Sequence, residues 1–183
     1  MTRQRLLPAL LLTLGAALAL PAVAQVAPQA ASQAEQLSMI KSSDPKLARM
    51  KQHVWDFWRI VYEGGHVDEA PKYMAPEYIQ HNPNLPSGRD TFMNFFRTAR
   101  PAKPVLDHMK MPVVSITAEG NRVVILSARK VRDRAKPDHI YSITWFDAFR
   151  IDDKGLIAEH WDPSEMWVDG KPPGAEFFTE WDK

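Results

Sequence analysis

The stretch of residues 145–162, WFDAFRIDDKGLIAEHWD, constrains the fold more than any other part of the chain. Apolar and polar residues alternate on both sides of residues 152–155, which are of turn-forming type, and this pattern predicts a β-hairpin. With those four residues as the loop, counting outward places Asp147 opposite His160. Directly opposed residues have Cβ atoms about 5 Å apart, so these two side chains are expected to touch.

The face that this register gives to Asp147 and His160 is otherwise mostly apolar. It carries Trp145, Phe149, Ile151, Leu156, Ala158 and Asp162, whereas the opposite face carries Phe146, Ala148, Arg150, Ile157, Glu159 and Trp161. An acid and an imidazole on such a face indicate a lined pocket rather than an ion pair on a wet surface. A core histidine satisfied by the acid is the alternative interpretation.

The N-terminus has the three parts of a secretory signal peptide. Arg3 and Arg5 precede an almost wholly apolar run, residues 6–20, and residues 22–24 form an A-x-A cleavage site. The run is shorter than the roughly 20 apolar residues that a membrane anchor needs. We therefore expect residues 1–24 to be removed and Gln25 to begin a periplasmic or secreted protein, with no stable membrane insertion after cleavage.

Composition narrows the classes of partner. The chain has 183 residues, with 23 basic and 22 acidic side chains and no cysteine. No excess of basic charge is available for a nucleic-acid footprint, so nucleic acid is excluded as a partner. Without disulfides, the domain must be held together by its core alone.

Helical and strand-like patterns follow one another along the chain. Residues 25–43 predict a linker that is flexible or at best marginally helical. Asp44 and Pro45 begin a helix that ends at Gly64-Gly65, and two further helices are expected over residues 67–74 and 89–100. Residues 78–83 are extended, and strands are expected over residues 113–119, 122–131, 140–151 and 156–162.

This order predicts one α+β domain over residues 44–162. Three N-terminal helices would cover a strongly bent, mixed or antiparallel sheet, giving a cone-shaped barrel with a deep pocket. The remaining residues, 163–183, form an aromatic tail that is expected to pack on the domain or on a partner subunit.

Several motifs in this order resemble the SnoaL-like branch of the nuclear transport factor 2-like superfamily. They are residues 78–83 (YIQHNP), Gly88-Arg89, Phe95-Phe96, residues 147–150 (DAFR) and residues 159–162 (EHWD). The resemblance implies the cone-shaped α+β fold and a homodimer formed through the outer sheet face. Relatives include polyketide cyclases, which close rings by aldol condensation without a cofactor and use an acidic residue. Ketosteroid isomerases and limonene epoxide hydrolases share the fold.

The resemblance also carries over site residues. It implies catalytic roles for His81, Asp147 and His160, and substrate contacts for Asp162. Tyr78, Gln80 and Asn82 are candidates for orienting hydrogen bonds, and Trp145 and Phe149 line the same predicted face. Asp147 can take a proton next to a carbonyl, while His160 or His81 holds the resulting enolate oxygen.

Two other functions fit the same residues. A non-catalytic binding module needs only a dry pocket with a few polar groups for a small ligand. A metal site could use His81, His108, His160 and Asp147, but no metal-binding spacing is present and Asp147 and His160 more simply satisfy each other. We therefore expect neither a metal nor a cofactor.

Overall fold

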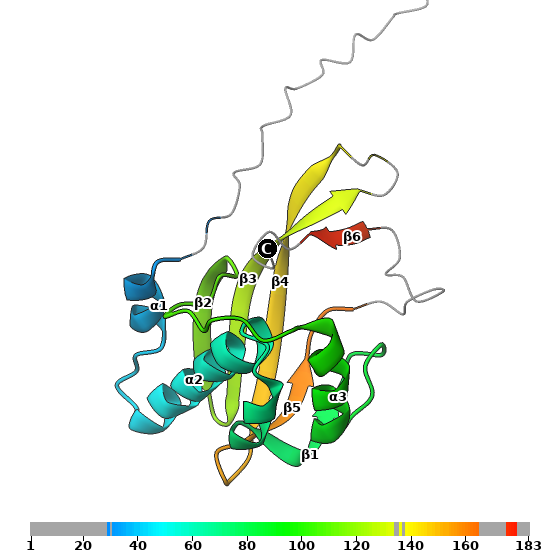
Figure 1. The fold of residues 1–183 in the computed structure, drawn as a ribbon. Coiled ribbons are helices and arrows are strands. Elements are labelled where there is room, and N and C mark those ends of the chain that lie inside the picture. Colours follow the sequence, from blue (N-terminus) through cyan, green and yellow to red (C-terminus); the bar gives the residue numbers. More distant parts are fainter. Residues whose placement is uncertain (1–28, 30, 134–135, 137, 165–174, 179–183) are drawn as a thin grey trace, which may run out of the picture.

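The computed structural model describes residues 29, 31–133, 136, 138–164 and 175–178. The predicted signal peptide, the first part of the predicted linker and most of the aromatic tail lie outside these residues. A curved sheet forms one layer, and helices cover its concave face (Figure 1). Within the described residues, no helix is long and apolar enough to cross a membrane.

The principal helix begins and ends where the sequence predicts. Helix α2, Pro45–Phe57, has Asp44 as its N-cap, whose carboxylate accepts hydrogen bonds from Lys46 N at 2.7 Å and Leu47 N at 3.4 Å. A π-helical segment, Trp58–Glu63, continues it to Gly64. Helix α2 lies over β2 and β3 of the sheet. Together, α2 and the π-helical segment bury the apolar side chains of Met50, Val54, Trp55, Phe57, Trp58 and Val61.

The shorter helices differ in kind. Residues Val67–Lys72 form a 3₁₀-helix rather than the α-helix expected over residues 67–74, because in an α-helix the ring of Pro71 would clash with the carbonyl of Val67. The chain then enters β1 at Met74. Helix α3, Arg89–Ala99, agrees with the prediction and packs over β1 with Phe92 buried (Figure 1).

Part of the predicted linker is an ordered helix. Helix α1, Gln33–Met39, begins with a capping box in which Ser32 and Glu35 satisfy each other's backbone N–H groups. Gln36 is fully buried and bonds to Met109 and Trp55. The expected flexible linker is therefore wrong for this segment, because one glutamine supplies hydrogen bonds that its composition does not reveal.

The sheet is mixed and strongly curved. Its strands run in the order β1 (Met74–Gln80), β5 (Ile157–Trp161), β4 (Ile140–Ile151), β3 (Arg122–Asp133) and β2 (Val113–Glu119). Only the β1–β5 pair on this path is parallel, and β6 (Ala175–Phe178), in the predicted tail, pairs antiparallel with the far end of β3. The sheet does not close into a barrel, but the predicted α+β class and cone-like shape are confirmed.

The register of the β4–β5 hairpin differs from the prediction by two residues. His160 lies opposite Phe149, not opposite Asp147. One residue is gained in the loop, because Asp152 Oδ1 accepts the N–H of Leu156 at 2.9 Å and withdraws it from the ladder. The second is gained at a bulge between the Ile151 and Arg150 pairs, where Ala158 has no partner.

Because the two register shifts add up to two residues, the side chains beyond the bulge return to the sheet face on which the sequence predicted them. Because side chains alternate with period two, Asp147, Phe149 and His160 still point into the cone. Ile157 lies before the bulge, so it turns inward and is fully buried, contrary to its predicted place on the outer face. Phe146 and Trp161 remain outside.

Candidate active site

A cavity of about 640 Å³ opens between the concave face of the sheet and the helices. Most of its wall is apolar and aromatic: Phe57, Trp58, Tyr62, Leu85, Phe92, Phe95, Phe96 and Phe149. Most of its polar groups come from neighbouring strands and the segments after them: Tyr78, Gln80, Asn82, Arg129, Asp147, His160 and Asp162. The cavity can therefore enclose a small organic molecule and present ionisable groups to one part of it.

Asp147 and His160 form the centre of the polar region. The Asp147 side chain is buried, and its Oδ1 lies 3.1 Å from His160 Nε2. The two residues are diagonal neighbours across β4 and β5, a spacing that long side chains can bridge. Phe149 stacks on the imidazole with ring centroids 4.6 Å apart and planes 11° from parallel. The predicted contact is present, although by a different register.

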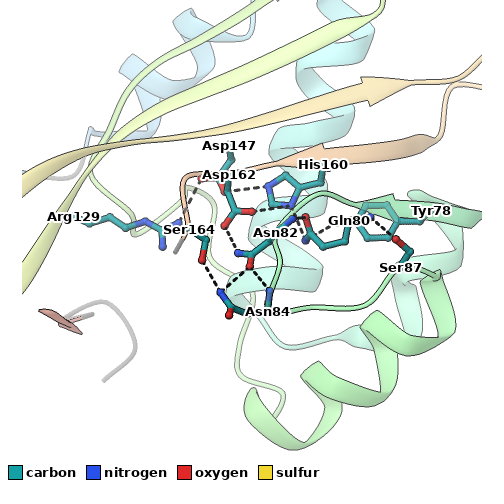
Figure 2. Close-up of polar contacts among 10 residues, drawn as sticks. All are labelled: Tyr78, Gln80, Asn82, Asn84, Ser87, Arg129, Asp147, His160, Asp162 and Ser164. Carbon is teal, nitrogen blue, oxygen red and sulfur yellow. Dashed lines mark hydrogen bonds and ion pairs between the residues drawn. The ribbon is translucent and has the colours of Figure 1, made fainter. Parts of the chain in front are cut away.

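Gln80 determines which nitrogen of His160 can carry a proton. The backbone N–H of Asn82 donates to Gln80 Oε1 at 3.1 Å, which turns the amide nitrogen of Gln80 towards His160 Nδ1 at 3.0 Å. A glutamine amide nitrogen is only a donor, so Nδ1 must accept. The ring proton then lies on Nε2, where it is donated to Asp147. Figure 2 shows this chain of contacts.

A second carboxyl group, Asp162, lies on the other side of the imidazole. Its Oδ2 accepts a hydrogen bond from Asn82 Nδ2 at 2.9 Å, and its Oδ1 is buried 3.9 Å from His160 Nδ1 (Figure 2). Burial raises the pKa of Asp162 above its ordinary value, and the nearby Asp147 carboxylate adds to this effect. Protonated Asp162 can act as a hydrogen-bond donor.

Tyr78 supplies a third polar group from the floor of the cavity. Its hydroxyl oxygen accepts a hydrogen bond from Gln80 Nε2 at 3.1 Å. Burial holds the pKa of Tyr78 well above its ordinary value, and the charges of Asp162 and Asp147 act in the same direction. Among the hydrogen bonds of the described residues, none takes up the hydroxyl proton, so Tyr78 can donate it to a ligand.

His81 does not join the cavity, and its predicted place beside Asp147 is wrong. Gln80 pairs with His160 in the parallel β1–β5 ladder, so alternation turns His81 to the opposite face. There His81 Nε2 contacts Glu159 Oε2 at 2.9 Å, and its ring stacks on Trp161 with centroids 4.4 Å apart. The same alternation places Tyr78, Gln80 and Asn82 inside, as predicted.

Three further side chains, Phe149, Trp145 and Arg129, lie close to this polar region. Phe149 lines the cavity, whereas Trp145 lies under Arg129, whose guanidinium carbon is 4.2 Å from the indole centroid. Arg129 faces the cavity from β3 and reaches towards Asp147 Oδ2 at 3.5 Å. The sequence prediction missed Arg129. Its position on the same strand face as the buried Val123, Ile125 and Ser127 was the available signal.

The histidines of the alternative metal site are spread over the fold. His108 Nδ1 contacts the adjacent Asp107 at 2.6 Å, and His81 lies on the outer face with Glu159. Within the described residues, no group of three histidine or carboxylate side chains is arranged to hold a metal ion.

Solved structures similar to this chain include TsrD from Streptomyces laurentii, with 22% identity and a TM-score of 0.44 over 67% of this chain and 90% of that one. An LEH-like epoxide hydrolase from M. tuberculosis has 13% identity and a TM-score of 0.44, over 62% and 80% of the two chains. An NTF2-like protein of unknown function from Burkholderia pseudomallei has 20% identity and a TM-score of 0.42, over 63% and 89%. None of the curated proteins compared with the chain matches it.

The match that identifies the family comes from the sequence itself. Residues 54–160, more than half of the chain, match the family described as the SnoaL-like domain. The matched stretch runs from the last turn of α2 to His160 and thus includes Tyr78, Gln80, Arg129 and Asp147. The chain therefore belongs to the SnoaL-like domain family, and the resemblance inferred from its motifs is confirmed.

Proposed function

We propose that this protein is a cofactor-independent acid–base catalyst that acts on a small carbonyl-containing organic molecule. The observation that carries the proposal is the buried carboxylate of Asp147, which faces an aromatic cavity of about 640 Å³ and is held by His160 Nε2 at 3.1 Å. A carboxylate in such surroundings is oriented and kept from bulk water, as a general base requires.

The hydrogen bonds assign different tasks to the two oxygens of Asp147. Oδ1 accepts the His160 N–H, and Oδ2, which Arg129 approaches only at 3.5 Å, keeps a lone pair for a substrate proton. In the proposed reaction, Asp147 removes a proton from the carbon next to a substrate carbonyl. The electrons of that C–H bond form the enolate, and its charge develops on the carbonyl oxygen. His160 acts as a positioning residue for Asp147.

Tyr78 and protonated Asp162 are the proposed donors to the enolate oxygen. Both line the cavity. The raised pKa of Tyr78 keeps its hydroxyl proton in place at neutral pH, and the raised pKa of Asp162 keeps its carboxyl proton in place to a higher pH than in an ordinary aspartate. Donors that are already oriented stabilise developing charge without reorganisation. The enolate carbon can then attack a second carbonyl, whose oxygen takes the proton back from Asp147. If the enolate is conjugated with a C=C bond, Asp147 can instead return the proton to the γ-carbon, which shifts the double bond.

The test is a ligand screen by thermal shift, followed by product analysis of each hit with the wild type and Asp147→Asn. The variant nearly preserves shape but lacks the base, so turnover should fall by roughly 10²-fold or more while ligand affinity is kept. Asp153→Asn, an exposed aspartate in the β4–β5 loop, is the matched control and should retain full turnover. If the wild type alters none of its ligands, the protein is a binding module and the proposal is wrong.

We also propose that the protein acts outside the cytoplasm and as a homodimer. The N-terminal signal-peptide pattern of residues 1–24 supports export. Phe146 remains 43% exposed on the outer sheet face, next to the partly exposed Trp161, and this exposed apolar surface supports dimerisation.

A further inference from the structure

Arg129 is a partly buried cation whose hydrogen-bonding capacity is largely unused. Its side chain is only 12% exposed, and its sole ion pair among the described residues is with Asp147 Oδ2 at 3.5 Å. Hydrogen bonds between guanidinium and carboxylate groups are normally 2.7–2.9 Å long, so this pair is not closed. Arg129 Nε is buried without a hydrogen-bond partner. A guanidinium has five donors, and most of those of Arg129 are available.

Among the described residues, three partly buried arginines have an Nε without a hydrogen-bond partner, and of these Arg129 lines the cavity. Arg59 and Arg89 also leave Nε without a partner, but Arg59 donates to Asp56 Oδ1 at 2.7 Å and to the carbonyl of Leu106. Arg89 donates to the carbonyl of Met74 at 3.3 Å. Neither arginine lines the aromatic cavity, whereas Arg129 does. The unused donors of Arg129 therefore face the space that a ligand would occupy.

Stacking holds the guanidinium in place without consuming its donors. The Arg129 guanidinium carbon lies 4.2 Å from the Trp145 ring centroid, and Figure 2 shows the side chain extending from β3 towards Asp147 and Asp162. A planar group stacked on one face keeps its N–H bonds in the plane, where they can meet a carboxylate by two parallel hydrogen bonds.

The charge of the cavity also favours an anion. Its charged lining residues are Arg100, Lys103 and Arg129 against Asp147 and Asp162. Asp147 already interacts with His160, and the pKa of Asp162 is raised, which diminishes its negative charge. Arg100 is stacked over Tyr62 at 4.2 Å, so this positive charge borders the aromatic wall.

We propose that the substrate is an organic carboxylate with an aromatic or alicyclic body, and that Arg129 binds its carboxylate group. The aromatic wall would enclose the body, and Arg129 would place the carbon next to the substrate's carbonyl within reach of Asp147. This proposal rests on the proposed function for the identity of the site, but binding can be measured without turnover.

The experiment compares two probes of the same shape, 2-naphthoate and 2-naphthamide, by isothermal titration calorimetry on the wild type. Naphthoate should bind roughly ten- to a hundredfold more tightly, the usual worth of a hydrogen bond to a charged group. Arg129→Met keeps an unbranched apolar side chain over Trp145 and should abolish this preference. Arg129→Lys should keep part of it, because it retains the charge but not the fork of parallel donors.

Arg122→Met is the matched control. Arg122 lies on the same strand and also near a tryptophan, 5.7 Å from the Trp161 centroid, but it is exposed outside the cavity. This variant should bind both probes as the wild type does. Equal binding of the two probes by the wild type would overturn the proposal, even if Arg129→Met failed to fold, and so would an unchanged preference in folded Arg129→Met.

The two proposals can fail separately. Asp147→Asn should retain or strengthen the preference for naphthoate, because it removes a negative charge near Arg129. A retained preference in a protein that transforms no carboxylate would refute catalysis and support the role of Arg129. Turnover restricted to neutral compounds would support catalysis and refute the proposed substrate class.

Discussion

Gln36 tests whether α1 is an integral part of the domain. Its side chain is fully buried, and its Nε2 donates to Met109 O and Ala31 O, both at 2.8 Å. Its Oε1 accepts from Trp55 Nε1 at 2.9 Å and from Met109 N at 2.8 Å. Gln36→Leu nearly keeps the volume of this side chain but removes all four hydrogen bonds.

The expected loss of stability follows from the groups that the variant leaves behind. Both backbone groups of Met109 and the Trp55 indole N–H lose a buried partner. Each such group costs about 1–3 kcal/mol, and the added apolar surface of leucine returns about 1 kcal/mol. We expect the free energy of unfolding to fall by about 2–8 kcal/mol, a large part of the roughly 5–15 kcal/mol of a typical domain.

Urea unfolding followed by tryptophan fluorescence measures this difference. Gln33→Leu places the same substitution on the exposed side of the same helix and serves as the control. Its free energy of unfolding should stay within about 0.5 kcal/mol of the wild type. A loss below about 1 kcal/mol in Gln36→Leu would show that α1 is not docked in solution, since buried polar groups cannot lose their partners without that cost.

Other predictions concern protonation, assembly and export. In ¹⁵N NMR, the neutral His160 ring should carry its proton on Nε2, and Gln80→Glu should place a proton on Nδ1; a neutral wild-type ring with its proton on Nδ1 would contradict the assigned network. Asp162 has a raised pKa in the folded state, so its stabilising contribution is full below its ordinary value of 3.8 and is lost as pH rises through the folded value. The Tm of Asp162→Asn relative to the wild type should therefore rise between about pH 3 and about pH 7, and a flat difference would refute the shift. Phe146→Glu should convert a dimer into a monomer in light scattering, whereas a monomeric wild type would end that proposal. N-terminal sequencing of exported protein should begin at Gln25, not at the initiator methionine.

Local patterns in the sequence determined most elements of this fold and the face on which Asp147 and His160 lie. Asp44 and Pro45 mark the start of α2 because capping and the fixed φ of proline act within one turn. Period-two alternation placed Asp147 and His160 inside the cone and survived a register shift, because that shift was an even number of residues.

Only the tertiary structure decided what these elements meet. The hydrogen bond from Leu156 N to Asp152 Oδ1 and the bulge at Ala158 are particular geometries, and they altered every cross-strand pair of the hairpin. Gln36 joins α1 to Met109, which lies 73 residues away, so no local pattern could reveal it. His81 was assigned to the site with its neighbours, but pairing with β5 decided which side chains of β1 face the cavity. Arg129 became a candidate for substrate binding only when the fold placed it beside Asp147 and left its Nε without a partner, because hydrogen-bond satisfaction is a property of the surroundings and not of the residue.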